Sequence, residues 1–567
     1  MRYVRRSARQ IQPLFATAGA CLALGCLSAG DPPEGQHLLP DRTPAAVFFT
    51  ASEADGVASN LLVAGPVRQA GPQSVPEVDL YRLAYGAEEV TPNNLNNLAP
   101  TVPNVVIGAD GDPATYIPHT DSQGRLLFVQ SVDGAPDFET QVARFNLATG
   151  QEEVLGPPAA DSPGYLLSHS RSRVFVDSTL FDLDHATDLS PLTDAQPVFI
   201  GDDLYYGTVG SSDEIAVSSR VMRDRPGSTP EVILSVVGTL KFAAVDSDVA
   251  PELLLSWEGP SGDSPFTLLD TESLVSTSLP SEAGQTQFVS ASSDGHVLMF
   301  QGSDSNREPR LLLFDWTTGN RAWLDKSSLG QAIGDFGQWR PGHDEWWTLL
   351  STGGYPTGFA IWNEIGLRSS RSTSDLPVAV THEPDGGNTM FTRDGRYWFS
   401  ADYRLAASAV GFTVFVVSAD DPTRPRVVLS PEGSVPCALW ETSDGRLLAG
   451  SSAFDVNRQD IYLVDPDAGT SHVIATGGRV VALGRTRALA LLNWQLSTST
   501  GDLTLVDLAT GTKTVLAQDV YNVAVDPGIS ADVSPDADLL APGTIVAFLS
   551  RNRLASPYDG LWVTHLP

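Results

Sequence analysis

Short apolar runs follow glycine-containing turns at regular intervals along most of the chain. Runs such as RLLF and RYWF span four to six residues, and polar stretches rich in Gly, Pro, Asn and Asp separate them. This pattern predicts β-strands, because a helix would need ten or more residues with apolar positions every three to four. No long amphipathic helical pattern follows the first 26 residues. We therefore expect an all-β protein.

One turn phrase recurs with small changes. An Asp-Gly pair in such a turn supplies the positive φ that a tight hairpin needs. From Gly295 the intervals between copies are 47, 53 and 50 residues, which is in the range of propeller blades and of some helical repeats. The copies are DSQGRLLFV at Gly124, SSDGHVLMF at Gly295, WRPGHDEWW at Gly342, TRDGRYWFS at Gly395, TSDGRLLAG at Gly445 and SPDADLLAP at Ala537.

A second phrase, ATG or a close variant, lies at a nearly constant distance from the first. It ends at Gly150, Gly319, Gly469 and Gly511, and in three units the two glycines are 26, 24 and 24 residues apart. The first phrase would join strands one and two, and the second would join strands three and four. Each unit is therefore predicted to be a four-stranded antiparallel blade of a β-propeller.

We expect two tandem propellers. Seven units fit between about residue 240 and residue 567, and about four less regular units fit between residues 45 and 237. All eleven Trp lie at or beyond Trp257, so the two regions also differ in composition. The expected division is an irregular propeller region over 45–237 and a propeller of about seven blades over 238–567. A ring of about eleven blades would be unusual, and exchange of blades across the boundary stays open.

The turn phrase resembles the repeats of TolB-like β-propellers, whose blades carry a Ser-Pro-Asp-Gly turn followed by an apolar strand. Ser534-Pro535-Asp536 and Trp339-Arg340-Pro341-Gly342 are the closest local matches. The resemblance extends from about residue 116 to the end of the chain. It implies the fold, and it carries over no catalytic residues, since propellers host unrelated activities.

The first 26 residues predict an export signal. Four arginines precede a short apolar stretch rich in Ala and Gly, and this stretch is too short for a membrane span. Its end, LALGC at Cys26, resembles the bacterial lipoprotein signal, although Ala23 stands where that family more often has Leu. The resemblance implies a lipid anchor on Cys26 and, because Leu27 follows, an outer-membrane destination of undetermined side. Cys21 as the lipidated residue and an ordinary secretory signal are the alternatives.

Residues 27–44 are rich in Pro, Gly and charged side chains, so we expect a flexible tether there. Once Cys21 is removed and Cys26 is modified, only Cys437 remains, and the mature protein has no internal disulfide. Cys437 lies in an apolar run, which favours a buried structural thiol.

The chain carries a formal net charge of −33, which would repel nucleic-acid phosphates. We find no G-x-S-x-G, H-E-x-x-H, P-loop or G-x-G-x-x-G motif, so no catalytic residue, cofactor or metal is predicted. Calcium binding by an acidic loop stays undecided. HDEWW at residues 343–347 combines acid, imidazole and indole groups, but it occupies a turn and the following strand. We therefore expect Trp346 and Trp347 to pack within a blade.

The connections between second and third strands vary most in length and composition, and such loops commonly carry binding residues. They should lie at one rim, the loop rim, while the glycine turns lie at the opposite rim, the turn rim. The candidate binding residues of the loop rim are Asp402, Tyr403, Arg404, Asp455, Asn457 and Arg458. The expected function is a non-enzymatic, lipid-anchored envelope platform for a protein or glycan; a glycan- or ligand-binding sensor and a polysaccharide lyase or glycosidase are the alternatives.

Overall fold

The structure is a computed structural model, and its described part consists almost entirely of β-strands. It also contains one 3-10 turn, η1 (Leu95–Asn97). Cys21, Cys26 and Ala537 lie outside the described residues, as do Asp455 and Asn457. The described residues are 33–40, 43–50, 60–68, 76–85, 95–107, 119–132, 139–158, 165–182, 185–193, 195–209, 218–245, 252–258, 266–279, 285–292, 294–303, 309–324, 332–352, 355–363, 366–372, 388–406, 409–423, 426–429, 435–442, 444–452, 458–526, 539–552 and 556–567.

Two four-stranded groups begin the fold and share one eight-stranded sheet, in which β5 and β7 also pair. All strand pairs in this sheet are antiparallel. The first group contains β2 (Ala46–Thr50), β3 (Asn60–Ala64), β4 (Glu77–Leu83) and β5 (Val102–Val106); the second contains β6 (His119–Thr120), β7 (Leu126–Ser131), β8 (Thr140–Asn146) and β9 (Gln151–Val154).

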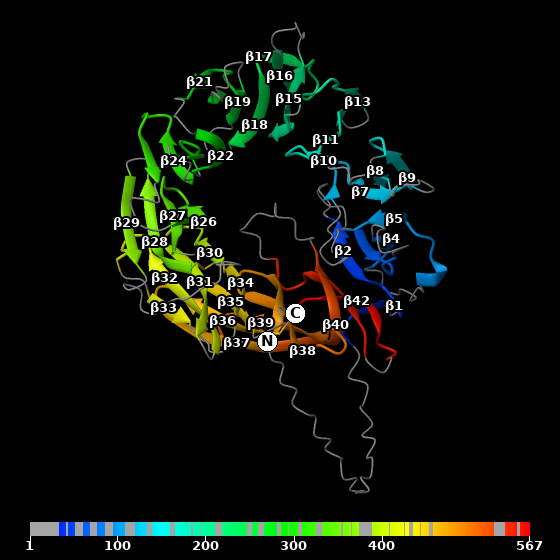
Figure 1. Cartoon of the computed structure of the whole chain (residues 1–567). Helices are drawn as coiled ribbons and strands as arrows, with labels where there is room; N and C mark the ends of the chain where they lie inside the picture. The colour runs from blue at the N-terminus through cyan, green and yellow to red at the C-terminus, as the bar shows by residue number, and fades with distance from the viewer. Residues whose placement is uncertain are drawn as a thin grey trace, which may run out of the picture. The chain divides into compact units, whose positions relative to one another are not determined.

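Six separate four-stranded sheets follow, each with its strands in chain order (Figure 1). Their strands are β10 (Tyr165–Leu167), β11 (Arg173–Val176), β12 (Thr179–Asp182), β13 (His185–Asp188); β14 (Val198–Ile200), β15 (Asp203–Val209), β16 (Ser218–Asp224), β17 (Glu231–Val237); β18 (Thr239–Val245), β19 (Glu252–Glu258), β20 (Phe266–Asp270), β21 (Ser276–Ser278); β22 (Gln285–Ala291), β23 (Val297–Ser303), β24 (Pro309–Asp315), β25 (Arg321–Leu324); β26 (Ala332–Trp339), β27 (Trp346–Thr352), β28 (Tyr355–Asn363), β29 (Gly366–Ser372); and β30 (Asn388–Phe391), β31 (Tyr397–Ala406), β32 (Ala409–Ser418), β33 (Arg426–Leu429).

The last ten strands form one sheet, in which two long strands each belong to two groups. The first part of β37 pairs with β36 and its second part pairs with β38, and β40 pairs in the same way with β39 and β41. The strands are β34 (Val435–Glu441), β35 (Leu447–Ser452), β36 (Gln459–Asp465), β37 (Thr470–Leu483), β38 (Arg487–Gln495), β39 (Thr500–Asp507), β40 (Lys513–Val525), β41 (Ile545–Ser550), β42 (Gly560–His565) and, from the other end of the chain, β1 (Gln36–Leu39).

β1 completes the last group by pairing antiparallel with β42, and Figure 1 shows the blue and red strands side by side. Leu38 and Leu39 are 1% and 0% exposed, within an apolar cluster shared with β2, β3, β41 and β42. The second half of the expected tether, residues 27–44, therefore includes a folded strand. Burial of two adjacent leucines outweighs the flexibility that neighbouring Pro and Gly would allow.

The described residues thus contain eleven four-stranded groups: six separate sheets, two in the eight-stranded sheet and three in the ten-stranded sheet. This architecture confirms the predicted all-β fold built of four-stranded antiparallel blades. Four groups end by Val237 and seven begin after it, and the last of these takes its fourth strand, β1, from the other end of the chain. Among the described residues, no helix has the length and apolar character that crossing a membrane requires.

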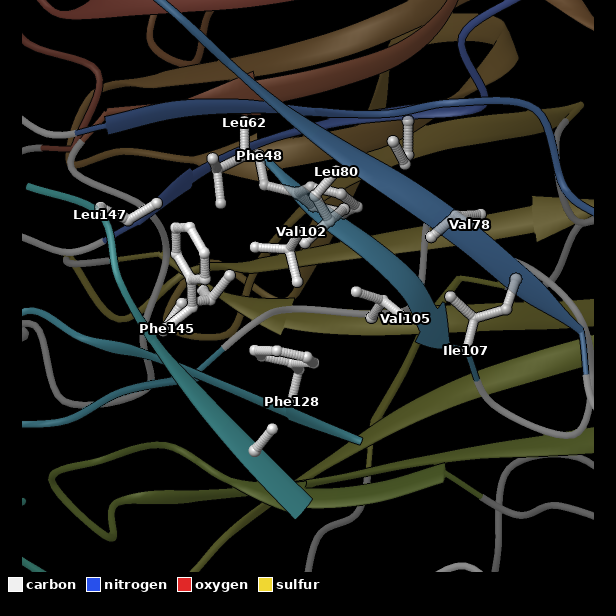
Figure 2. Packing of buried hydrophobic residues seen from close by; sticks show 14 residues of the cluster. Phe48, Leu62, Val78, Leu80, Val102, Val105, Ile107, Phe128, Phe145 and Leu147 are labelled. Atoms are coloured by element: carbon white, nitrogen blue, oxygen red, sulfur yellow. The ribbon is translucent and has the colours of Figure 1, made fainter. Parts of the chain in front are cut away.

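Apolar clusters join each group to the next along the chain. Figure 2 shows the cluster between the first two groups, in which Phe48 and Leu80 meet Phe128 and Phe145. A cluster containing Tyr205 and Leu240 spans the boundary expected at residue 237, and residues 33–567 form one compact unit.

The last group also packs against the first. Val47 donates its backbone N–H to Asn522 Oδ1 at 2.9 Å, and the Tyr521 hydroxyl donates to the Pro44 carbonyl at 2.6 Å. Each group therefore packs against the next, and the last group packs against the first. These contacts do not divide the groups into the two expected propellers. The spacing of the repeats indicates the number of blades. How the blades are grouped depends on which of their faces are buried against one another.

The recurring turns owe their shape to local hydrogen bonds as well as to glycine. The turn glycines 124, 150, 295, 319, 342, 395, 445, 469 and 511 all have φ between +66° and +78°. In the first turn type, the Thr392 hydroxyl donates to Asp394 Oδ1 at 2.6 Å, and the Arg396 N–H donates to the same oxygen at 3.0 Å. In the second type, Asp507 Oδ1 accepts the N–H groups of Ala509 and Thr510 at 3.0 and 2.7 Å. These hydrogen bonds stabilise the reversal of the chain, and the glycine supplies the positive φ that the reversal requires.

Candidate functional site: two rims and a tryptophan pocket

At the turn rim, arginines of one group donate to backbone carbonyls of the next group. The donor–acceptor pairs are Arg82–Leu147 (2.6 Å), Arg173–Asp224 (2.7 Å), Arg223–Thr271 (2.8 Å), Arg340–Gly395 (2.8 Å), Arg426–Pro466 (2.6 Å) and Arg487–Pro567 (2.7 Å). This role is not visible in the sequence, because the arginines occupy different strands and turns of their groups.

Three of the six predicted binding residues lie in a strand instead of a loop. Asp402, Tyr403 and Arg404 belong to β31, where they pair with Thr413, Phe412 and Gly411 of β32. The polar sequence suggested a loop, but the β31–β32 hairpin continues through it as an extended ladder. Of the other three, Arg458 is described and is exposed just before β36.

The described part of the loop rim is most complete between the last two groups. The Arg551 guanidinium donates to the Thr498 carbonyl at 3.2 Å and lies 4.9 Å from the centre of the Tyr521 ring. It thereby ties the β41–β42 connection to the β38–β39 connection. Leu496 is 63% exposed beside this tie, so an apolar side chain is presented to solvent here.

Carboxylates near this tie serve to organise the connections. Asn552 donates its side-chain N–H to Asp519 Oδ2 at 2.7 Å and its backbone N–H to Asp559 Oδ1 at 2.6 Å. Burial raises the pKa of Asp519, and the charges of Asp502 and Asp559 raise it further against the Asn552 hydrogen bond. Within the described ranges, no group of three or more His, Cys, Asp or Glu side chains is placed to hold a metal ion.

A pocket of about 550 Å³ lies at the opposite end of the strands, near the turn rim. It is lined by residues at or near the ends of the first strands β22, β26 and β30, together with the start of β27. The residues that shape it are Ser290, Gly337, Gln338, Trp339, Trp346 and Phe391. Sequence reasoning missed the pocket, because its walls come from three different groups.

Trp346 and Trp347 have different surroundings. Trp347 is 0% exposed and stacks on Phe359, which confirms the predicted packing within the blade. It also contacts Phe391 and Trp398 of the next group. Trp346 is 9% exposed and also forms part of the pocket wall. Its expected packing is confirmed as well, because it belongs to an apolar cluster with Met299 and Trp362.

Comparison with known proteins finds structural likeness only. No protein-family model matches the chain, and no curated protein sequence matches it. A eukaryotic initiation factor structure is 12% identical, with a TM-score of 0.37, and the match covers 77% of this chain and 98% of that one. TolB from Acinetobacter baumannii is 15% identical, with a TM-score of 0.22 and coverage of 56% and 82%.

The β-propeller domain of the trilobed protease from Pyrococcus furiosus is 11% identical, with a TM-score of 0.26 and coverage of 58% and 98%. Likeness at these identities concerns the fold alone. The succession of four-stranded antiparallel groups is itself that of a β-propeller.

Proposed function

We propose that this chain is a non-enzymatic, lipid-anchored β-propeller of a bacterial cell envelope, and that its loop rim is a docking platform for an envelope protein. The observation that supports this most is the contrast between the rims. Arginines tie the turns of one rim to neighbouring groups, whereas the connections of the other rim differ from group to group. A rigid scaffold that carries dissimilar loops suits recognition of one specific surface.

The described loop rim offers suitable contact chemistry. Leu496 is exposed, Arg458 presents a guanidinium, and Arg551 with Tyr521 provides a half-buried cation–aromatic pair. Aromatic and arginine side chains are enriched among residues that dominate binding energies at protein interfaces. The docking partner should therefore present apolar surface together with hydrogen-bond acceptors for these guanidinium groups.

The platform is tested by photocrosslinking from each rim in membranes of the native host. A probe replaces Ser497 at the loop rim or, as the matched control, Thr510 at the turn rim; both residues are exposed. We expect the Ser497 probe to capture one recurring protein and the Thr510 probe to capture none. Capture of the same proteins from both positions, or of no recurring protein from Ser497, would refute the docking rim.

The lipid anchor needs a separate experiment. Radioactive palmitate should label the wild-type chain and the Cys437→Ala control, and labelling should disappear in Cys26→Ala. Persistent labelling of Cys26→Ala that is lost in Cys21→Ala would move the anchor to Cys21. No labelling of the wild-type chain would remove the anchor from the proposal and leave the docking platform to be judged by crosslinking.

A further inference from the structure

We infer that the pocket beside Trp339 binds the uncharged sugar ring of a glycan. It lies near the turn rim, whereas the proposed protein platform lies at the loop rim, so the two proposals are independent. At about 550 Å³, the pocket falls within the range of roughly 300–1,000 Å³ that small-molecule sites occupy.

The aromatic wall is held in place before any ligand arrives. Trp339 donates its indole N–H to Ser290 Oγ at 3.0 Å, which fixes the ring against the neighbouring group. Trp346 meets Trp339 edge to face, with centroids 5.4 Å apart and an interplanar angle of 67°. A wall fixed in this way loses little conformational freedom on binding, which favours affinity.

Gly337 has a specific part in this arrangement. A Cβ at this position would lie 2.2 Å from Trp346 Cζ2, so only glycine lets the indole lie directly against the backbone of β26. The close approach places the Trp346 ring directly beside Gly337. Glycine is therefore required here by packing against the aromatic ring.

The pocket remains partly open to solvent although its walls are largely apolar. Val289, at its edge, is 46% exposed, and the Trp339 ring is only half-buried. Exposed apolar surface gathered in a concave site is a common mark of a binding site. The accessible part of the Trp339 indole offers a surface on which a ring-shaped ligand would stack.

The uncharged lining of the pocket favours an uncharged ligand. Among the described lining residues there is no Asp, Glu, Lys, Arg or His, so neither an anion nor a cation would find a counter-charge. The net charge of −33 further disfavours an anionic sugar, such as a uronate, through long-range repulsion.

The polar groups of the pocket distinguish a sugar from a purely apolar ligand. The Ser290 hydroxyl and the Gln338 amide both line it, and each can donate and accept hydrogen bonds. A sugar ring offers an apolar C–H face to an indole and hydroxyl groups around its edge. An apolar ligand could not use these polar groups, whereas the hydroxyls of a sugar can hydrogen-bond to them.

The test is calorimetric and fluorescence titration of the folded protein with neutral oligosaccharides, namely cello-, malto- and chito-oligomers of three units. We expect saturable binding of at least one oligomer, weakened at least tenfold in Trp339→Ala and less strongly in Ser290→Ala. Trp323→Ala is the matched control, because Trp323 packs under Arg310 on the outer strand of the β22–β25 sheet. It should bind as the wild type does.

Thermal unfolding of each variant, followed by circular dichroism, separates loss of binding from loss of folding. The variant Trp339→Phe keeps an aromatic face and should retain part of the affinity. Failure of all three oligomers to bind would overturn the inference. So would binding that Trp339→Ala leaves unchanged, or tighter binding of galacturonate oligomers or of free indole at the same tryptophan. None of these results bears on crosslinking from Ser497.

Discussion

Buried arginines of the turn rim carry positive charge into places that water hardly reaches. The Arg173 side chain is 2% exposed; it donates to the Asp224 carbonyl and, at 2.9 Å, to the Asp202 carbonyl, and it pairs with the Asp224 carboxylate. Such a guanidinium is stable only because several oxygens surround it, and its planar group reaches more of them than a lysine amine could. These residues therefore matter for joining groups to one another.

Replacing Arg173 by Ala should destabilise the protein by roughly 3–5 kcal/mol, because it leaves the buried Asp224 carboxylate unpaired. Arg396→Ala is the control: Arg396 and its partner Asp394 are 52% and 47% exposed, so the expected loss is about 0–1 kcal/mol. Urea unfolding followed by tryptophan fluorescence measures both variants. Equal unfolding midpoints for the two would show that the buried pair is not what joins these groups.

At the scale of the element, the repeated turn combines a glycine with an acidic side chain that receives several hydrogen bonds. Burial tends to raise the pKa of Asp394, but hydrogen bonds from Thr392 and Arg396 outweigh it and lower that pKa to about 2. The pKa values of Asp294 and Asp444, in the equivalent turns, are also lowered in spite of burial. A hydrogen bond from Ser292 lowers that of Asp294, and hydrogen bonds from Arg446 and Thr442 lower that of Asp444. The same chemistry thus recurs in three groups.

Because these pKa values are lower in the folded state than the ordinary value of 3.8, the turns contribute stability above about pH 4. That contribution should fade as the pH falls toward 2. The triple variant Asp294→Asn, Asp394→Asn and Asp444→Asn should therefore lose less stability than the wild type between pH 5 and pH 2. Urea midpoints across this range measure the difference, and 0.5 M NaCl controls for general charge repulsion. Parallel curves for the two proteins would contradict the assignment.

For the whole molecule, the decisive contact joins the two ends of the folded unit. β1 adds an edge strand to β42, and its leucines enter a cluster that also contains Val47 and Ala547. Without this strand, β42 would expose unpaired backbone groups and apolar surface. Closure of the packing order therefore combines this strand, whose residues lie more than 500 positions from β42, with the contacts of Val47 and Pro44 to the last group.

Leu38→Ala combined with Leu39→Ala should lower stability by roughly 2–5 kcal/mol for each leucine, as expected for truncation of buried side chains. Hydrogen exchange followed by mass spectrometry should rise in β42 and β2, which flank the closure, and stay unchanged in the distant β25. Glu34→Ala, at an exposed position, is the control. Unchanged exchange in β42 would mean that β1 does not hold the closure.

The sequence by itself determined the all-β class, the four-stranded unit, the number of units and the positive φ of the turn glycines. These features are local: the Asp-Gly turns and the short apolar runs specify each hairpin wherever the hairpin lies. Only the tertiary structure decided that β1 pairs with β42 and that Asp402, Tyr403 and Arg404 extend a strand. It also placed Ser290, Trp339 and Phe391 in one pocket. The β31–β32 pairs are local to one hairpin, and they form although the polar sequence suggested a loop. The contacts of β1 and of the pocket join residues from about fifty to more than 500 positions apart, and they depend on which faces of the sheets are buried together.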